Sequence, residues 1–277
     1  MNFIFPGLID LHVQSAPDLR PRRHTDLELA AEARRAGARA VVIKSHHVPT
    51  MDRAWHTSRA TPGLAVFGGL ALNWGVGGLN PHATAAALGQ GAKIVWLPTL
   101  HSGPHRRREG RDDGIAVTRD GRVVDAALQI FEQVAEADAI LATGHLGADE
   151  IPLVVAAASA RRVRKIVVTH PEHDVVGMSL DQQRALAREF PVFFERCYSQ
   201  PDGHGGYTSN FAANLRAIEV LGFSTTVLST DAGQIENPSW TECWDRTVQA
   251  YRAAGVTEVA LQAMCSTHAA GLLKLEG

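Results

Sequence analysis

The stretch from residue 138 to residue 170 constrains the fold more than any other part of this 277-residue chain. It contains two short apolar runs, 140–143 and 166–169, separated by a segment with helical spacing of apolar residues. This pattern predicts a β-α-β unit in which the apolar runs are buried parallel strands. A histidine, His145 or His170, follows each run. Because α/β proteins bind ligands at the carboxyl ends of parallel strands, the two imidazoles favour a metal site over a packing role.

Similar apolar runs recur along the chain and alternate with helical patterns. The eight predicted strands cover residues 3–11, 40–43, 64–72, 93–97, 140–143, 166–169, 192–194 and 225–228. Eight β-α units without a linker predict an α/β fold, a (β/α)8 TIM-type barrel that forms a single domain over residues 1–277. An open doubly wound sheet is the alternative, but no G-x-G-x-x-G turn follows the first strand.

Charge and composition narrow the classes of partner. The net charge of −2 argues against a general nucleic-acid binder or a binder of anionic membranes. No apolar run is long enough to span a bilayer, and the N-terminus lacks the pattern of a signal peptide. The three cysteines are odd in number and widely spaced, which favours reduced thiols in the cytoplasm. We therefore expect a small-molecule substrate, and the sequence leaves open whether the chain forms a homo-oligomer.

The residues that follow the predicted strands combine imidazoles with carboxylates and a lysine. They are His12, Gln14, Lys44, His46, Thr99, His101, His145, His170, Glu195 and Asp231. Imidazoles with a carboxylate suit zinc or a similar first-row ion that keeps a position open for water. Such an ion lowers the pKa of bound water to about 7. Asp231 could take the proton of that water and pass it to a leaving group.

Eight motifs in order resemble the amidohydrolase superfamily, and within it an uncharacterised branch of unknown function. The motifs are DLHVQSAPD, VIKSHHVPT, GGLN, GAKIVWLPT, ATGH, VTHPEH, FFERC and STDAGQ. The resemblance covers nearly the whole chain. It implies a distorted eight-stranded barrel, one or two divalent metal ions and hydrolysis with Asp231 as the proton shuttle. By motif position it also implies the metal ligands His12, His145, His170 and Asp231. Zinc is favoured, with manganese and iron as alternatives.

Two positions depart from the superfamily pattern. The first motif is usually H-x-H, but here Gln14 takes the place of the second histidine. An amide oxygen is a weak ligand, so the metal deepest in the barrel is expected to be lost or loosely held. Many binuclear members also carry a bridging lysine carbamate or glutamate after the fourth strand, where this chain has neither. Lys44 is the nearest substitute: it can bridge metals as a carbamate, bind substrate as an ammonium, or pair with Asp10.

Four further residues are expected to contact substrate: Gln14, His46, His101 and Glu195. His46 is favoured over His47 because it shares a strand face with Lys44, with helix capping as the alternative. Glu195 can instead orient a histidine or pair with its neighbour Arg196.

Cys197 and the basic run 105–111 can each be interpreted either as functional or as purely structural. Cys197 has no dedicated base in the sequence, so burial is favoured over a role as a nucleophile. The basic run 105–111 lies in the longest irregular segment, residues 100–122, which ends in a predicted hairpin at Asp120 and Gly121. The run is either a clamp for an anionic substrate on a lid or a solvated loop.

The leading functional hypothesis is a metal-dependent hydrolase that uses metal-activated water on a small-molecule amide, imide or lactone. A mononuclear decarboxylase or hydratase of the same superfamily is the first alternative. The second is a non-catalytic relative that binds a metal or ligand, with Gln14 as the residue that removed activity.

Overall fold

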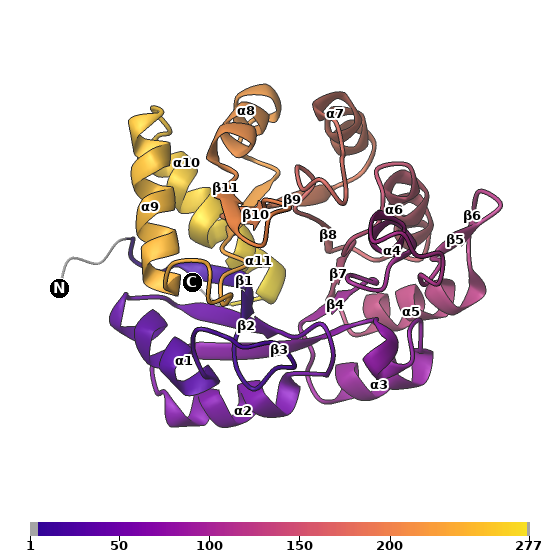
Figure 1. Cartoon of the computed structure of the whole chain (residues 1–277), viewed down its shortest axis with the longest axis horizontal. Helices are drawn as coiled ribbons and strands as arrows, with labels where there is room; N and C mark the ends of the chain where they lie inside the picture. The colour runs from indigo at the N-terminus through magenta and orange to yellow at the C-terminus, as the bar shows by residue number, and fades with distance from the viewer. Residues whose placement is uncertain (1–4, 276–277) are drawn as a thin grey trace. The chain divides into compact units, whose positions relative to one another are not determined.

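The computed structural model describes residues 5–275 (Figure 1). Eight strands form one parallel sheet in the order β1, β2, β3, β4, β7, β8, β9 and β12. Their bounds are Ile9–Gln14, Ala40–Lys44, Ala65–Ala71, Ile94–Trp96, Ile140–Ala142, Ile166–Thr169, Val192–Cys197 and Thr226–Ser229. Each strand coincides with one of the apolar runs, and the predicted (β/α)8 barrel class is confirmed.

Helices alternate with these strands, as the apolar spacing predicts. The first eight are α1 Asp26–Arg35, α2 Met51–Ala60, α3 Pro81–Gly89, α4 Gly103–Arg108, α5 Asp125–Glu136, α6 Glu150–Ala160, α7 Leu180–Glu189 and α8 Phe211–Leu221. The chain ends in α9 Trp240–Ala253, α10 Glu258–Gln262, a π-helix Ala263–Thr267 and α11 His268–Leu273. Local sequence sets the helix starts. Thr25 and Glu28 form a capping box before α1, and Asn80 caps α3 just ahead of Pro81.

Contacts divide the chain into two compact units. Unit 1 comprises residues 1–44, 52–68 and 196–277, and unit 2 comprises residues 45–51 and 69–195. Unit 1 holds β1, β2, the start of β3 and β12, whereas unit 2 holds the end of β3, β4, β7, β8 and most of β9. The single domain expected from the sequence stays a prediction.

In unit 1, β1 pairs with β2 on one side and meets the end of β12 on the other. A register shift between Asp10 and Val13 leaves Gln14 opposite Lys44. On the other side, Asp231 N donates to His12 O at 2.9 Å and Gln14 N donates to the carbonyl of the residue after Asp231 at 2.8 Å. These backbone bonds bring the end of β12 beside the histidine of β1.

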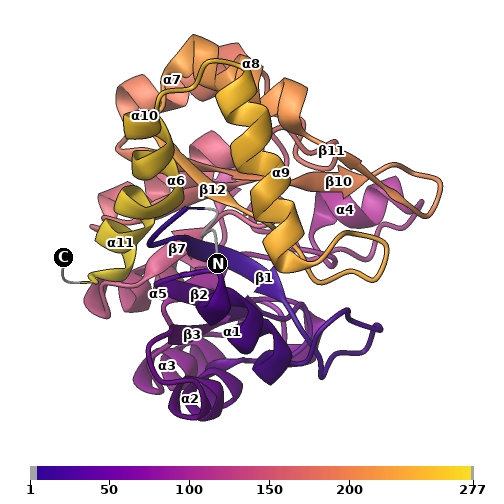
Figure 2. The same ribbon diagram turned by 90° about the vertical axis from the view of Figure 1, so that its left-hand side faces the viewer.

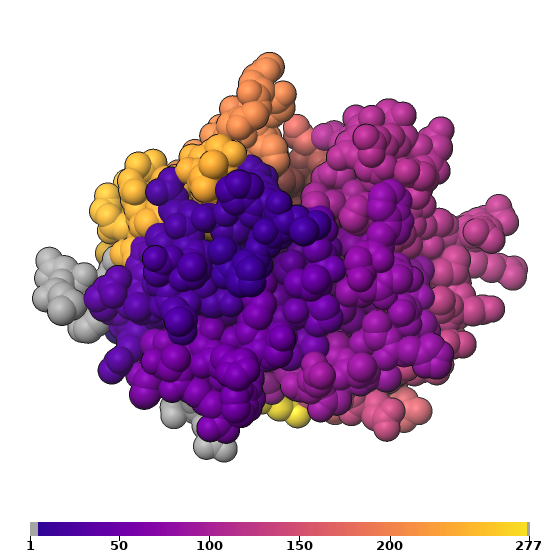
Figure 3. Space-filling view, turned by 60° about the horizontal axis from the view of Figure 1, so that its bottom comes forward, coloured from indigo at the N-terminus to yellow at the C-terminus, as the bar shows by residue number. Residues whose placement is uncertain are grey.

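The core of unit 1 lies where α9 packs beside α1 and α8 (Figure 2). Trp240, Trp244 and Tyr251 of α9 are fully buried there with Leu29 of α1. Large aromatic side chains bury the most apolar area per residue, so they anchor the helices against β1 and β2. The opening part of unit 1, residues 5–44, forms a continuous indigo to violet surface in Figure 3.

In unit 2, β4, β7 and β8 pair in parallel, and α5 packs beside α3 and α6. The predicted hairpin is confirmed as β5 Thr118–Arg119 and β6 Arg122–Val123, which pack against α6 (Figure 1). Its turn residues Asp120 and Gly121 both have positive φ, 52° and 71°, as a tight two-residue hairpin turn requires.

Three details of the sequence prediction were wrong. The first strand was expected from residue 3, but residues 3 and 4 lie outside the described residues, and β1 runs from Ile9 to Gln14. The irregular segment 100–122 contains α4, which starts because Ser102 caps it and Pro104 follows in its first turn. The seventh strand was expected to end at residue 194, but β9 continues to Cys197 and is followed by a hairpin, β10 Ser199–Pro201 and β11 Tyr207–Ser209.

Candidate metal and catalytic site

Four of the predicted site residues meet in unit 1. His12 Nε2 lies 3.0 Å from Asp231 Oδ1 and 2.8 Å from Lys44 Nζ. Gln14 Nε2 donates to the same Asp231 oxygen at 2.7 Å. His12 is fully buried and Lys44 is 1% exposed, so water screens this cluster of charges only weakly. The cluster therefore joins an imidazole, a carboxylate and the lysine nitrogen at a site of low dielectric constant.

A glycine allows the chain after β12 to approach β1 this closely. Asp231 has a φ of 49°, and Gly233, two residues later, has a φ of 122°. A Cβ at Gly233 would lie 1.8 Å from the carbonyl oxygen of Gln14. Since only glycine avoids that collision and also adopts the backbone conformation, it fixes the path that places Asp231 beside His12.

The amide of Gln14 is oriented by its two neighbours. Its Oε1 accepts a hydrogen bond from the Arg22 guanidinium, and Arg22 Nε also donates to Asp18 Oδ2 at 2.7 Å. A guanidinium only donates and a carboxylate only accepts, so the amide oxygen must face Arg22 and the amide nitrogen must face Asp231. Gln14 therefore orients Asp231 and does not offer its oxygen as a metal ligand. Its expected contact with substrate stays a prediction.

Asp10 ties β1 to the end of β12 and to α9. Its carboxylate accepts hydrogen bonds from His12 N at 3.0 Å, Thr230 Oγ1 at 2.6 Å and Trp240 Nε1 at 2.8 Å. Burial raises the pKa of Asp10 to about 6, and these hydrogen bonds oppose the rise. The residue holds His12 and the Asp231 segment in place through their backbone.

A third ligand-type atom lies beside His12 and Asp231. The nitrogen of His12, the Sγ of Cys197 and a carboxylate oxygen of Asp231 all lie within 4.8 Å of one another. The predicted burial of Cys197 is confirmed, since the residue is 1% exposed, but its place in this cluster was not predicted. The expected strand ended at residue 194, whereas β9 continues to Cys197. Strand alternation from Glu195 would have placed Cys197 on the same face.

Unit 2 gathers a second set of predicted residues, all histidines. The rings of His145 and His170 lie 5.0 Å apart, and those of His46 and His145 lie 5.9 Å apart. His46 Nδ1 is 2.7 Å from the Thr99 hydroxyl, which also accepts from Asn73 Nδ2 at 2.6 Å. His145 and His170 follow neighbouring strands, as expected, and their rings lie close together. Their role as metal ligands stays a prediction.

Two further histidines belong to this set: His105, which the sequence analysis placed in the basic run 105–111, and His173, which it missed. His105 Nδ1 lies 2.9 Å from His145 Nδ1, so one of these nitrogens donates to the other and fixes both tautomers. The rings of His173 and His170 lie 4.2 Å apart. The spacing of His173, three residues after His170 in the motif VTHPEH, was the available signal. We name five of the histidines of unit 2 the imidazole cluster: His46, His105, His145, His170 and His173.

His101 and the basic run lie beside an exposed indole. The His101 ring stacks on Trp74 at 4.0 Å, and the Arg106 guanidinium lies 4.8 Å from the same indole. Burial, followed by the positive charges of His47 and Arg106, lowers the pKa of His101. Arg106 is paired with Asp113 at 2.8 Å and also with the carboxylate of the residue at 109. Its charge is therefore already matched, which removes it from the expected anion clamp.

Glu195 is the last of the predicted substrate contacts. It lies opposite Thr169 of β8 in the register of β9 and is 1% exposed. A contact with substrate stays a prediction for Glu195, as it does for His46 and His101.

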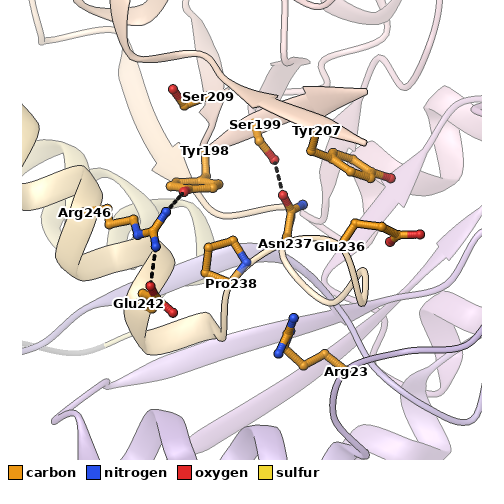
Figure 4. Close-up of a pocket in the computed structure, with 10 residues that line it drawn as sticks. All are labelled: Arg23, Tyr198, Ser199, Tyr207, Ser209, Glu236, Asn237, Pro238, Glu242 and Arg246. Atoms are coloured by element: carbon orange, nitrogen blue, oxygen red, sulfur yellow. Dashed lines mark hydrogen bonds and ion pairs between the residues drawn. The ribbon is translucent and has the colours of Figure 1, made fainter. Parts of the chain in front are cut away.

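A pocket of about 420 Å³ lies in unit 1, lined by β10, β11, the loop after Asp231 and α9 (Figure 4). Ser199 Oγ donates to Asn237 Oδ1 at 3.1 Å across one side of it. Tyr207 lines another side, and burial followed by the negative charge of Asp231 raises its pKa. The lining residues Glu236 to Pro238 belong to the loop that follows Asp231.

Residues 7–195 match a protein-family model described as a family of unknown function, DUF6282. The chain belongs to this family. The match includes His12, Lys44, His145 and His170 and ends before Asp231. No curated protein matches the sequence.

Solved structures with the same fold come from the amidohydrolase superfamily. An amidohydrolase from Pseudomonas aeruginosa is 11% identical, with a TM-score of 0.69 over 97% of this chain and 96% of that chain. The probable dipeptidase PvdM from the same organism is 9% identical, with a TM-score of 0.67 over 97% and 94%. A 2,6-dihydroxybenzoate decarboxylase is 13% identical, with a TM-score of 0.57 over 98% and 100%. These structures confirm the fold that the motif resemblance implies, and identities this low show the fold alone.

None of the helices within residues 5–275 has the length and apolar character needed to cross a membrane.

Proposed function

We propose that this protein is a metal-dependent hydrolase that acts on an amide, imide or lactone bond of a small molecule, with Asp231 as its general base. The observation that carries the proposal is the 3.0 Å contact between His12 Nε2 and Asp231 Oδ1 in the buried cluster of unit 1. These are the two residues that the motif pattern assigns to the metal and to proton transfer.

The donor atoms around His12 fit a divalent ion. Zinc ligands lie about 2.0–2.3 Å from the ion and hence about 3.5 Å from one another. The nitrogen, sulfur and oxygen atoms of His12, Cys197 and Asp231 lie within 4.8 Å of one another, so small side-chain shifts suffice to surround one ion. A bound ion of this kind would activate water and polarise a carbonyl group. By motif position, His145 and His170 are proposed as further ligands.

Each residue of the unit 1 cluster has a separate role in the proposed hydrolysis. Asp231 takes a proton from the attacking water and delivers it to the leaving group, and Gln14 holds its carboxylate in position. A nearby cation keeps that carboxylate ionised near neutral pH. As an ammonium, Lys44 stabilises the negative charge that develops on the substrate oxygen. The positive charge and the base therefore lie on either side of His12 Nε2.

The pocket beside Asp231 supports a substrate that carries a negative group. Two arginines line it, and Arg246 is paired with Glu242. Arg23 donates to the Ile235 carbonyl at 2.6 Å and forms no ion pair within the described residues 5–275. Its guanidinium points toward the loop of Asn237 in Figure 4. An arginine whose charge is not matched is suited to a substrate carboxylate.

Product analysis in isotopically labelled water tests the reaction class. The protein, loaded with zinc, is incubated with small amides, imides and lactones that carry a carboxylate, and the products are identified by mass spectrometry. Hydrolysis predicts one labelled oxygen in the product, and this product disappears after metal removal and returns with zinc. Release of carbon dioxide without label would replace hydrolysis with decarboxylation.

A further inference from the structure

The three cysteines of the chain differ in their surroundings although all are buried. Cys243 Sγ contacts the Pro238 carbonyl at 3.7 Å, and burial raises the pKa of Cys243 to about 12. Burial also raises the pKa of Cys265. Within the described residues, only Cys197 belongs to a group of three ligand-type side chains. Cys197 is thus distinguished by its neighbours and not by its burial.

A nucleophilic role does not fit these neighbours. A nucleophilic thiol needs a base that can take its proton. In the proposed function Asp231 is the base for the attacking water and His12 is a metal ligand, so neither is assigned to take a proton from the thiol during turnover. A buried thiol whose sulfur lies near a carboxylate oxygen and an imidazole nitrogen instead has the arrangement of a metal ligand.

Gln14 explains why a sulfur ligand is useful here. The superfamily pattern places a second histidine at this position, and the Gln14 oxygen faces Arg22 instead. One donor is therefore missing from the first motif, and Cys197 arrives from β9 at the same cluster. We propose that Cys197 is a thiolate ligand of the metal ion held by His12 and Asp231, in the place of that missing histidine. The inference rests on the metal site of the proposed function and specifies its ion.

A thiolate restricts the ions that this site accepts. Sulfur ligands favour zinc, cobalt and cadmium over magnesium and manganese, which prefer oxygen. On binding, the Cys197 thiol gives its proton to solvent, because a thiol must be deprotonated before it coordinates. Loss of this ligand should weaken zinc binding by at least the roughly 10–100-fold that loss of an outer-shell partner costs.

Cobalt substitution tests the inference without reference to activity. The full chain is freed of metal, loaded with one equivalent of Co²⁺ and examined by ultraviolet absorption. A thiolate–cobalt bond gives a charge-transfer band in the near ultraviolet, whereas oxygen and nitrogen ligands do not. We expect the band in the wild-type protein and in Cys243→Ser, the matched control, and its loss in Cys197→Ser. Stoichiometric cobalt without the band, or a band that persists in Cys197→Ser, would overturn the inference.

Alkylation provides a second measurement that needs no variant. Bound zinc should protect Cys197 from iodoacetamide during partial unfolding and leave Cys243 and Cys265 unprotected, as peptide mass spectrometry would show. Equal labelling of Cys197 with and without zinc would count against coordination.

The outcomes of the cobalt and hydrolysis experiments also distinguish the thiolate ligand from the proposed hydrolase function. A cobalt–thiolate band in a protein without hydrolytic activity would retain the ligand and reject the hydrolase. Hydrolysis by a protein whose cobalt form lacks the band would support the hydrolase and reject Cys197 as a ligand.

Discussion

The cluster of unit 1 and the imidazole cluster of unit 2 hold their side chains in different ways. In unit 1 a single imidazole lies beside a carboxylate, a lysine nitrogen and a thiol, and close contacts join His12 to Lys44 and to Asp231. In unit 2 five imidazoles lie ring to ring, for example His170 against both His145 and His173. The nitrogen, oxygen and sulfur atoms of unit 1 suit both an ion and proton transfer, whereas the imidazoles of unit 2 offer nitrogen ligands alone. The comparison teaches that the number of histidines alone does not locate the proposed base, because the carboxylate of Asp231 lies beside the single imidazole of unit 1.

The largest expected effect is the loss of bound metal when His145 or His170 of unit 2 is replaced. If His145 and His170 coordinate metal, alanine at either position should remove bound metal and activity together, because a lost ligand cannot be replaced by water without a large loss of affinity. His173→Ala is the matched control, since its ring lies against His170 but it is not implied as a ligand. Metal content is measured by atomic emission. Full metal content in His145→Ala and His170→Ala would remove both residues from the ligand set.

Substitution of His105 should weaken zinc binding less than substitution of His145 or His170, because His105 is expected to orient a ligand and not to be one. His105 lies 2.9 Å from His145 through their Nδ1 atoms and therefore orients its ring. Because partners of metal-bound histidines typically contribute 10–100-fold to affinity, His105→Phe should weaken zinc binding by roughly that factor. Competition with a fluorescent chelator gives the dissociation constant. An unchanged constant would mean that the contact is packing alone, and a complete loss of metal would make His105 a ligand.

Gly233 offers a way to break the geometry of unit 1. Alanine there would place a Cβ against the Gln14 carbonyl and force a φ of 122° on a residue with a side chain. We expect Gly233→Ala to lower the free energy of unfolding by roughly 3 kcal/mol. Gly255→Ala is the control, with a positive φ of 82° but open space around its Cβ, and should cost about 1 kcal/mol. Equal values from urea denaturation would show that the close approach is not what constrains this segment.

The smallest expected effect concerns substrate binding at the pocket. Arg23→Gln should raise KM for a carboxylate substrate about 10-fold, the loss of one charge-assisted hydrogen bond, with kcat and stability little changed. Arg107→Gln removes an exposed charge from α4 and serves as the control. An unchanged KM for Arg23→Gln would place substrate recognition outside this pocket, and a rise only in Arg107→Gln would restore the basic run as the clamp.

Most strands and the position of the site could be predicted because burial on both faces leaves continuous apolar runs in the sequence. The runs before His145 and His170 are such cases. The end of β9 was missed because Glu195, Arg196 and Cys197 look like loop residues, although pairing with Thr169 of β8 keeps the backbone extended. A polar strand end is visible only when its partner strand is known.

The contacts that define the candidate site could be predicted only in part. The rule that ligands bind at the carboxyl ends of parallel strands predicted that His12, Lys44 and Asp231 lie together. The prediction held for these residues because the register of the strands sets the distances between their ends. It could not show that Arg22, eight residues after Gln14, returns to hold the glutamine oxygen. That contact depends on the path of a loop, which no periodic pattern encodes.

The most direct test of the central claim compares Asp231→Asn with Asp52→Asn, an exposed residue of α2 given the same chemical change. Both variants are loaded with zinc, and their metal content and single-turnover hydrolysis are measured side by side. The asparagine at position 231 keeps the shape of the side chain but cannot take a proton. We expect Asp231→Asn to retain its metal and to lose about 10²–10⁴-fold in kcat, with Asp52→Asn at the wild-type rate. A wild-type rate for metal-loaded Asp231→Asn would contradict the hydrolytic mechanism.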